Sequence, residues 1–358
     1  MSKLLSLIIP TYNMEALLPR CLESLLVPQT LERLEAIVVN DGSKDGSLKV
    51  AEDFRMRFPD TVTVIDKPNG NYGSTINAAL PIAKGKYVKV LDSDDWFNTD
   101  ALIQYLDALE SINADFIVTH FTIIHPGGKK ELAKYNLYGR EPYKYGQVYS
   151  LDKVLGDGHI RFFMMHAITY RKEMLRRNGY VQTEGISYTD LEWDTYPMFY
   201  AKDVVFINLD LYQYNMDREG QTMDPKVLNK CIGQQEKITS QILAFLNARG
   251  LDDLSPERQR FLRKYYLNRL RLICKSHLFD IDRKDFDPVH FALLEQEYQQ
   301  YCKDFSLGQI KLYPENKLIR CDAIKYWHRR HKRWPAWFES MNKGLNTFMK
   351  KLYMRLFR

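Results

Sequence analysis

An apolar stretch that runs directly into three acidic residues constrains this chain more than any other feature. Residues 88–96 read Val-Lys-Val-Leu-Asp-Ser-Asp-Asp-Trp, which predicts a buried strand ending in Asp92, Asp94 and Asp95. Carboxylates this close repel one another and lose solvation unless a cation joins them. A hard divalent ion, Mn²⁺ or Mg²⁺, meets that need with carboxylate, water and phosphate oxygens. The alternative is a solvated turn that caps a helix beginning near residue 99.

The segments before this strand alternate between buried strands and helices. Strands are predicted where continuous apolar runs occur, and helices where apolar residues recur at helical spacing. In chain order the expected elements are a strand at residues 4–10, a helix at 15–27, a strand at 35–40, a helix through Phe54, a strand at 61–65, a helix at 75–83 and a strand at 86–91. This alternation predicts a parallel sheet with right-handed crossovers, and such sheets bind ligands at the carboxyl ends of their strands.

Three ordered motifs resemble those of the family 2 glycosyltransferases: Pro-Thr-Tyr-Asn at residues 10–13, Val-Asn-Asp-Gly-Ser at 39–43 and Leu-Asp-Ser-Asp-Asp at 91–95. Segments at residues 168–174, 185–193, 206–214 and 218–222 resemble the second half of the same domain. The resemblance covers about residues 3 to 225 and fades beyond them. It implies the GT-A fold, a mixed and mainly parallel α/β sheet flanked by helices. It also implies a nucleotide-sugar donor, a divalent cation and sugar transfer with inversion.

The chain departs from the family pattern in the helix after the glycine-containing loop. Many members carry Ala-Arg-Asn there, whereas this chain has Ser-Thr-Ile-Asn at residues 74–77. The missing Arg puts a cationic contact to the donor in doubt. Lys67 or Lys89 could replace that contact.

By this resemblance, the nucleotide-sugar binds at residues near strand ends and in the Gly/Asn loop: Pro10, Thr11, Tyr12, Asn13, Asp41, Asn69, Gly70, Asp92 and Ser93. Tyr12 can stack on a base, or it is a half-buried loop aromatic. Asp41 can accept a hydrogen bond from the imide N–H of uracil, or it is a turn acid. The metal ligands are expected among Asp92, Asp94 and Asp95, where the cation would stabilise a diphosphate leaving group. The sequence does not show which acid contacts the ion directly.

The general base is expected in the segment Thr-Asp-Leu-Glu-Trp-Asp at residues 189–194. A carboxylate opposite the leaving group can remove the proton from an attacking sugar hydroxyl. By the resemblance Asp190 is the first candidate, with Glu192 orienting it or acting in its place. Alternatively these acids only cap a helix. His166 lies where an acceptor subsite is expected, although a His among apolar residues is more often structural.

The composition fits a cytosolic enzyme with one larger domain and an appendage. The five cysteines are scattered and form no Cys-x-x-Cys pair, which argues against both a disulfide framework and a zinc site built on such pairs. The first residues lack the apolar segment and cleavage site of a signal peptide. No run of eighteen apolar residues exists, so no membrane span is expected.

The character of the chain changes after residue 225. A catalytic domain is expected at residues 1–225, a helical region at 226–322 with helices at 227–249, 256–278 and 288–301, and a basic aromatic tail at 323–358. From Lys325 onward the tail carries ten Lys or Arg and one Glu, a net charge of +9, against +6 for the whole chain. Trp327, Trp334 and other aromatic residues interleave with these cations. The pattern predicts an interfacial helix pair on anionic lipid, with a tail packed on the catalytic domain as the alternative. Nucleic-acid binding is not expected, since no recognition motif accompanies the charge.

Together these features predict an inverting, metal-dependent glycosyltransferase of cell-surface polysaccharide synthesis. The expected donor is a UDP-sugar, and the acceptor is a saccharide or a lipid-linked glycan at the inner face of the cytoplasmic membrane. A sugar nucleotidyltransferase would instead carry a Gly-rich loop with Arg or Lys after the first strand, where this chain has Thr-Tyr-Asn-Met at residues 11–14. A non-catalytic scaffold of the same fold is the second alternative. It is expected to have lost the acids of the site, whereas this chain has all of them: Asp41, Asp92, Asp94, Asp95 and Asp190.

Overall fold

The structure, a computed structural model, describes residues 3–134, 141–160, 162–217, 231–301 and 323–335. The chain divides into two compact units. The first unit comprises residues 1–221 and 252–262, and the second comprises residues 222–251 and 263–358. A single β-sheet with flanking helices organises the first unit, whereas the described part of the second unit is helical.

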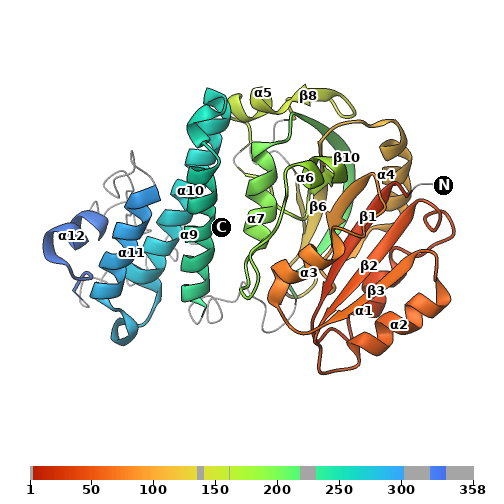
Figure 1. Ribbon diagram of the computed structural model, residues 1–358, viewed down its shortest axis with the longest axis horizontal. Coiled ribbons are helices and arrows are strands. Elements are labelled where there is room, and N and C mark those ends of the chain that lie inside the picture. The colour runs from red at the N-terminus through yellow and green to blue at the C-terminus, as the bar shows by residue number, and fades with distance from the viewer. Residues whose placement is uncertain (1–2, 135–140, 161, 218–230, 302–322, 336–358) are drawn as a thin grey trace, which may run out of the picture. The chain divides into compact units, whose positions relative to one another are not determined.

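Four parallel strands form the N-terminal half of the sheet (Figure 1). In spatial order they are β3 (Val62–Lys67), β2 (Leu34–Asp41), β1 (Leu5–Thr11) and β4 (Tyr87–Val90). The helices between them are α1 (Leu18–Glu23), α2 (Ser47–Arg57) and α3 (Asn71–Ala79). The predicted strand–helix alternation is therefore confirmed. The first helix is shorter than predicted, because the Leu25 N–H bonds to the Leu22 carbonyl and tightens the chain into a turn.

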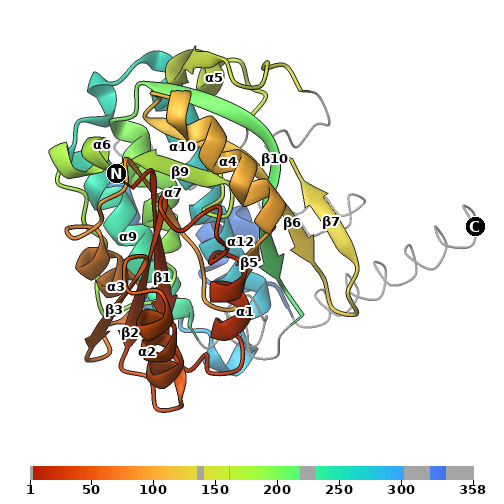
Figure 2. The ribbon, with the colours of Figure 1, turned by 90° about the vertical axis from the view of Figure 1, so that its right-hand side faces the viewer.

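The second half of the sheet is mixed. Strand β9 (Ile168–Arg171) lies antiparallel between β4 and β6 (Phe116–Ile124), and β6 pairs in parallel with β10 (Asp203–Asn215), which curves beside it in Figure 2. Three short strands pair antiparallel with these: β5 (Trp96–Phe97) and β8 (Val148–Ser150) with β10, and β7 (Lys130–Ala133) with β6. The helices of this half are α4 (Thr99–Ser111), α5 (Leu151–Gly156), α6 (Lys172–Arg177) and α7 (Asp190–Thr195), the last followed by a 3₁₀ turn (Tyr196–Phe199).

Every residue of β1 and β2 is buried, as expected for parallel strands covered by helices on both faces. Glu35, near the start of β2, is satisfied by hydrogen bonds. The Ser6 hydroxyl and the backbone N–H groups of Lys84 and Gly85 all donate to its carboxylate. The strands can thus stay central in the sheet and deliver their last residues to its carboxyl edge.

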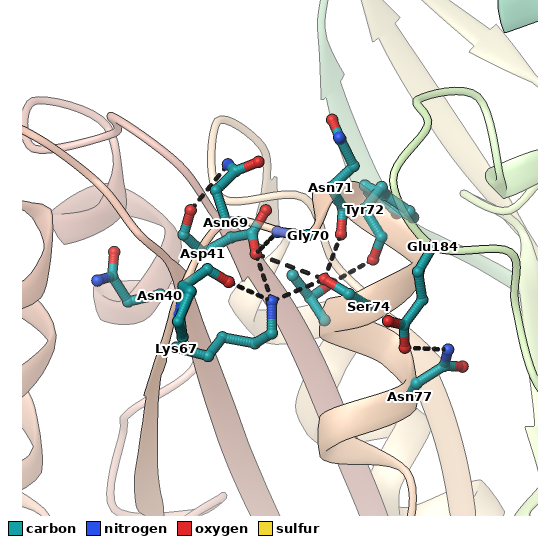
Figure 3. Close-up of polar contacts among 12 residues, drawn as sticks. Asn40, Asp41, Lys67, Asn69, Gly70, Asn71, Tyr72, Ser74, Asn77 and Glu184 are labelled. Atoms are coloured by element: carbon teal, nitrogen blue, oxygen red, sulfur yellow. Dashed lines mark hydrogen bonds and ion pairs between the residues drawn. The ribbon is translucent and has the colours of Figure 1, made fainter.

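A set of hydrogen bonds, here called the clasp, joins α3 to a segment about a hundred residues further along the chain. The Asn77 amide donates to the Gln182 carbonyl and accepts from the Gln182 N–H, both at 2.9 Å. The Gly185 N–H donates to the Gly70 carbonyl at 2.8 Å. Figure 3 shows the same face of α3, where Asn77 also donates to Glu184. The clasp fixes the segment that leads into α7.

Gly73 allows this close approach, and its replacement should loosen the clasp. A Cβ atom at Gly73 would lie 2.1 Å from the Thr183 carbonyl oxygen, so one backbone must move. We expect Gly73→Ala to lower the free energy of unfolding by about 1–3 kcal/mol, the usual range for an overpacked site. Urea unfolding measures this. Gly233→Ala is the control, because nothing lies within 4 Å of its Cβ position. Equal stability of Gly73→Ala and the wild type would contradict the role of the clasp.

Four helices dominate the described part of the second unit: α9 (Ile232–Ala248), α10 (Pro256–Lys275), α11 (Pro288–Tyr301) and α12 (Ala323–Arg330). Residues 256–262 of α10 are grouped with the first unit. Short turns lie at Leu251–Asp253 and Arg283–Asp285, and a π-helical turn (Ser276–Asp280) continues α10. The three helices predicted for residues 227–301 are confirmed within the described residues. Among those residues, no helix combines the length and the apolar character needed to cross a membrane.

Two aromatic residues predicted to face lipid are instead part of the core of the second unit. Trp327 is 1% exposed, and its ring lies 5.0 Å from that of Phe291. Trp334 is 3% exposed and lies 5.2 Å from Phe279. The prediction of an interfacial role is therefore wrong for these two residues, because apolar partners within the unit cover them. Residues 336–358, the rest of the predicted tail, lie outside the described residues.

Candidate active site

The acidic turn after β4 is tied to the end of β1. The Ser93 hydroxyl donates to the Pro10 carbonyl at 2.8 Å, and the Asp95 N–H donates to the Asp92 carbonyl at 3.0 Å. Ser93 is buried by this contact. Asp92 and Asp94, on either side of it, are only partly buried. The turn therefore keeps two carboxylates accessible at the carboxyl edge of the sheet, where ligands bind in open α/β folds.

Asp95 differs from the other two acids because it is buried and fully engaged. Its carboxylate accepts from the Tyr212 hydroxyl at 2.6 Å and from the Asn215 N–H at 2.7 Å. Burial, reinforced by the charges of Asp94 and Asp92, raises its pKa well above the usual range. The Tyr212 hydroxyl also accepts from the Asp92 N–H at 3.1 Å. Tyr212 thus holds both ends of the acidic turn from β10.

Tyr72 and His166 complete the surroundings of Asp92. The Tyr72 hydroxyl donates to Asp92 Oδ1 at 2.8 Å. Asp92, Asp95 and His166 each offer a ligand atom, and these atoms lie within 4.8 Å of one another. Carboxylate oxygens with a neutral imidazole are a donor set that fits a divalent cation. Asp94, expected among the ligands, lies on the same turn but outside this group of three.

His166 is buried between aromatic rings and a buried cation. Its ring stacks on Tyr214 at 4.2 Å and meets the edge of Tyr212 at 4.9 Å. Burial, with a contribution from Lys89, lowers its pKa to about 3. Lys89 itself is fully buried and donates to the carbonyls of His166 and Ile168 at 2.7 and 2.9 Å. Lys89 therefore supports the floor of the site and is not placed to replace the missing Arg at the donor.

Asp41 and the Gly/Asn loop form a second polar cluster at the same edge (Figure 3). Asp41 Oδ1 accepts from Lys67 Nζ at 2.6 Å and from the Gly70 N–H at 2.9 Å. Lys67 also donates to the Ser74 hydroxyl at 2.8 Å, and the Asn69 amide donates to the Asp41 carbonyl at 2.9 Å. Because these side-chain contacts fall on Oδ1, Oδ2 is the oxygen of Asp41 suited to an incoming N–H donor. Lys67 supplies a cation here.

Tyr12 extends from the end of β1 and is 46% exposed. The next residue, Asn13, has a left-handed backbone with a φ of 55°. Its N–H donates to the Ser43 hydroxyl at 3.0 Å, and its side chain accepts from the Lys44 N–H at 2.8 Å. These contacts join the loops after β1 and β2. The Tyr12 ring is thereby presented at the same edge as Asp41.

The two candidate base residues on α7 have different surroundings. Glu192 is fully buried, and its carboxylate accepts from the Thr183 N–H and hydroxyl at 2.7 Å and from the Tyr196 hydroxyl at 3.0 Å. Burial raises its pKa. These donors engage both oxygens of Glu192, which argues for a structural role and against its use as a substitute base.

Asp190, the first residue of α7, is partly buried. Burial first, and then the charges of Asp92 and Asp190, raise the pKa of Tyr72 well above its usual value. Asp190 and the acidic turn therefore act on the same hydroxyl. Burial and the charge of Asp190 also raise the pKa of Asp194, which lies behind it on the helix. Asp194 is also partly buried as a residue, but its Oδ1 atom is enclosed, and Glu192 is buried. Asp190 is therefore the better candidate for a general base among the acids on α7.

Tyr72 and Tyr212 are site residues that sequence reasoning missed. Tyr212 lies within a segment predicted as the final strand, and Tyr72 lies within the Gly/Asn loop. An aromatic residue in a strand or a loop is common, so only the fold shows that both hydroxyls reach the acidic turn. Asp41, Asp92, Asp95 and the Gly/Asn loop were predicted as site residues, and the structure places them along one edge.

Comparisons with known proteins bear on the family of the chain. Residues 6–179 match the family model described as glycosyl transferase family 2. The putative glycosyltransferase EpsH of Bacillus subtilis is 27% identical over 218 residues, covering 59% of this chain and 60% of EpsH. The poly(ribitol-phosphate) beta-glucosyltransferase of Bacillus spizizenii is 27% identical over 271 residues, covering 74% of this chain and 40% of the relative. An uncharacterized glycosyltransferase of Mycoplasma pneumoniae (MG025 homolog) is 39% identical over 101 residues, with 27% and 33% covered.

Solved structures agree on the fold. The crystal structure of S. aureus TarS 1–349 superposes with a TM-score of 0.61 at 21% identity, covering 83% of this chain and 80% of that one. The first unit is thus an α/β domain with the GT-A fold of glycosyltransferases. The match to the glycosyl transferase family 2 model lies within this unit, in residues 6–179. It spans between about a third and three fifths of the length of the first curated relatives that it matches.

The buried His166 should make the stability of the first unit depend on pH. Its pKa of about 3 lies below the ordinary 6.5, so the unfolded chain binds an additional proton between these values. Stability is therefore lost as pH falls, by up to about 2 kcal/mol for this residue between pH 7 and pH 5. His166→Phe keeps an aromatic ring. In urea unfolding, its free energy of unfolding should fall less steeply with decreasing pH than that of the wild type. Between pH 7 and 8 the free energies of unfolding of the two proteins should change in parallel. An unchanged slope below pH 6.5 would contradict a buried neutral imidazole.

Proposed function

We propose that this protein transfers a sugar from a nucleotide-sugar, with UDP as the nucleotide, to a saccharide or lipid-linked glycan in cell-surface polysaccharide synthesis. One observation carries the proposal: Tyr12, Asp41 and the acidic turn lie at the ends of three neighbouring parallel strands, and the charges of Asp190 and Asp92 both act on the Tyr72 hydroxyl. The printed names of relatives support it, since they include a hyaluronan synthase of Pasteurella multocida and the poly(ribitol-phosphate) beta-glucosyltransferase. TarS, whose fold is similar, has been solved with UDP and with UDP-GlcNAc.

Donor recognition is assigned to the loops after β1, β2 and β3. The exposed Tyr12 ring can stack on the base, a contact that contributes about 1–3 kcal/mol per base in other proteins. Asp41 Oδ2 can accept the imide N–H of uracil, which cytosine lacks. The Gly70 N–H donates to Asp41, and the missing side chain of Gly70 leaves room for Ser74 and Lys67, which also contact Asp41. Lys67 provides the cation nearest to this loop in the described part of the chain.

The acidic turn is assigned to a divalent cation, Mn²⁺ or Mg²⁺. Asp92 and Asp94 would hold it, with the donor atoms of Asp95 and His166 near Asp92. When bound, the cation would stabilise the charge that develops on the diphosphate as the glycosidic bond breaks. Tyr72 and Tyr212 act as positioning residues here, because their hydroxyls fix Asp92 and Asp95 before any ligand arrives. Preorganised charges of this kind need no rearrangement during the reaction.

Asp190 is assigned as the general base of an inverting reaction. It would remove the proton from the acceptor hydroxyl as that oxygen attacks the anomeric carbon from the face opposite the diphosphate. Glu192 acts as its support, since it anchors α7 to Thr183 and Tyr196. The clasp then holds this anchored segment against α3.

The proposal retains an anionic membrane surface at the cytosolic side as a partner, on the evidence of the charge in the tail. Four cations are exposed in the described part of the tail, residues 323–335: Lys325, Arg329, Arg330 and Lys332. The apolar side of α12, with Ala323, Ile324 and Trp327, is buried within the second unit. Membrane contact through this helix would therefore be electrostatic, at about 1 kcal/mol for each engaged Lys or Arg.

Removing the cation should weaken UDP binding. If the acidic turn binds the diphosphate through a divalent ion, EDTA should lower UDP affinity by at least about tenfold, or about 1.4 kcal/mol. Asp94→Ala should abolish most of this metal dependence, as measured by calorimetry with and without Mn²⁺. Asp60→Ala, an exposed acid of the same unit, is the matched control and should behave as the wild type. Equal UDP affinity with and without metal in the wild type rules out this assignment.

Replacing the base should separate binding from turnover. A panel of nucleotide-sugars with Mn²⁺, followed by donor hydrolysis, identifies the donor and tests the proposed activity itself. With that donor, Asp190→Asn keeps the shape of the side chain but cannot take the proton. Transfer should fall by roughly 10²–10⁴-fold while UDP affinity is kept. If Asp190→Asn retains turnover and Glu192→Gln loses it, the two roles are reversed.

A further inference from the structure

Three side chains with metal-binding chemistry converge within the second unit, on three different elements. Glu236 lies on α9, His277 on the π-helical turn after α10, and His290 on α11. His277 Nε2 lies 2.5 Å from Glu236 Oε1, and His290 Nε2 lies 2.9 Å from Glu236 Oε2. One ligand atom from each residue lies within 4.8 Å of the other two. None of these residues belongs to the catalytic unit.

One side of the cluster is buried, and the other side is exposed to solvent. Glu236 and His277 are buried, and the His277 ring packs against Phe291 at 5.1 Å. Phe291 in turn contacts Trp327 at 5.0 Å, so an aromatic floor underlies the histidine. The His290 side chain is 50% exposed and forms the solvent side of the cluster. The negative charge of a buried carboxylate must be compensated by hydrogen bonds or by a cation. A metal ion that does so needs a path from solvent, and the exposed side of His290 offers one.

We propose that Glu236, His277 and His290 form a binding site for a transition-metal dication, with Zn²⁺ as the ion that fits best. Two imidazole nitrogens and one carboxylate oxygen suit Zn²⁺, whereas Mg²⁺ and Ca²⁺ prefer oxygen ligands alone. Bond lengths of about 2.0–2.2 Å place neighbouring tetrahedral ligands about 3.3 Å apart. The His277–Glu236 contact of 2.5 Å must therefore lengthen, and the other ligand atoms, which lie within 4.8 Å of one another, must adjust to the same spacing. Water at the open side would complete the set. The site uses no cysteine, which agrees with the absence of Cys pairs in the sequence.

Such an ion would join α9, the turn after α10 and α11 at one point. The π-helical turn is significant because π-turns are rare and occur frequently at functional sites. Here the π-helical turn carries His277 directly after the end of α10. The Ile281 N–H donates to the Ser276 carbonyl at 3.0 Å and closes the turn. The proposed role is structural, and it is independent of the donor site and of the glycosyltransferase proposal.

The test is Zn²⁺ binding to full-length protein in excess Mg²⁺, which occupies oxygen-rich sites such as the acidic turn. Competition against a chromophoric chelator gives stoichiometry and affinity, and the visible spectrum with Co²⁺ reports the geometry. His290→Ala removes an exposed side chain and should fold normally. His328→Ala is the matched control, because His328 also contacts a glutamate, Glu295, but belongs to no group of three possible ligands among the residues that the structure describes.

The expected result is one tightly bound Zn²⁺ in the wild type and in His328→Ala, with a tetrahedral Co²⁺ spectrum. His290→Ala and Glu236→Gln should bind Zn²⁺ at least about tenfold more weakly, since even outer-shell changes reduce metal affinity by about 10–100-fold. Zn²⁺ should raise the thermal midpoint of the wild type and of His328→Ala but not of His290→Ala. The proposal is overturned if the wild type binds no Zn²⁺ in excess Mg²⁺, or if His290→Ala binds it as well as His328→Ala does. The three residues would then be a metal-free hydrogen-bonded cluster.

Discussion

Electrostatic crowding at the end of β4 is the constraint on which the first unit depends. Asp92, Asp94 and Asp95 fall within four successive positions, and like charges this close destabilise a fold unless the protein or a ligand compensates them. The structure separates their environments. Asp95 is buried and accepts two hydrogen bonds, while Asp92 and Asp94 are only partly buried. The protein itself therefore compensates the charge of Asp95 more fully than solvent alone would.

The polar groups that make this division come from distant parts of the chain. Tyr212 arrives on β10, and Tyr72 arrives at the start of α3. Below them, Lys89 donates to the backbone of the segment that carries His166. Tyr212 and Lys89 are buried, Tyr72 is partly buried, and all three are hydrogen-bonded. Satisfied networks of this kind hold side chains in a single arrangement. The sheet therefore serves the site chiefly by bringing separate strand ends to one edge.

The sequence predicts the N-terminal half of this unit well, because each of its signals is local. Continuous apolar runs define β1, β2 and β4, and the polar residues that end them mark the edge where the site lies. The second half is less predictable. β9 has four residues and pairs antiparallel with two partners, a choice that its own composition does not determine. Glu192 could not be told from Asp190 either, since its burial depends on Thr183, a residue in a loop without periodicity. In the tail, spacing alone could not show that Trp327 and Trp334 would find aromatic partners within the second unit.

The clasp has a consequence for how proteins of this design can diversify. Asn77 and Gly70 hold residues 182–185 at fixed points, and Asp190 follows after only a few more residues. Adding or removing a residue between the clasp and α7 would displace the carboxylate from the acidic turn. Substitutions between residue 185 and α7 can change side chains, but the number of residues in this segment cannot change. Insertions are accommodated more easily in the hairpin of β6 and β7, where nothing lies within 4 Å of a Cβ position at Gly127 or Gly128.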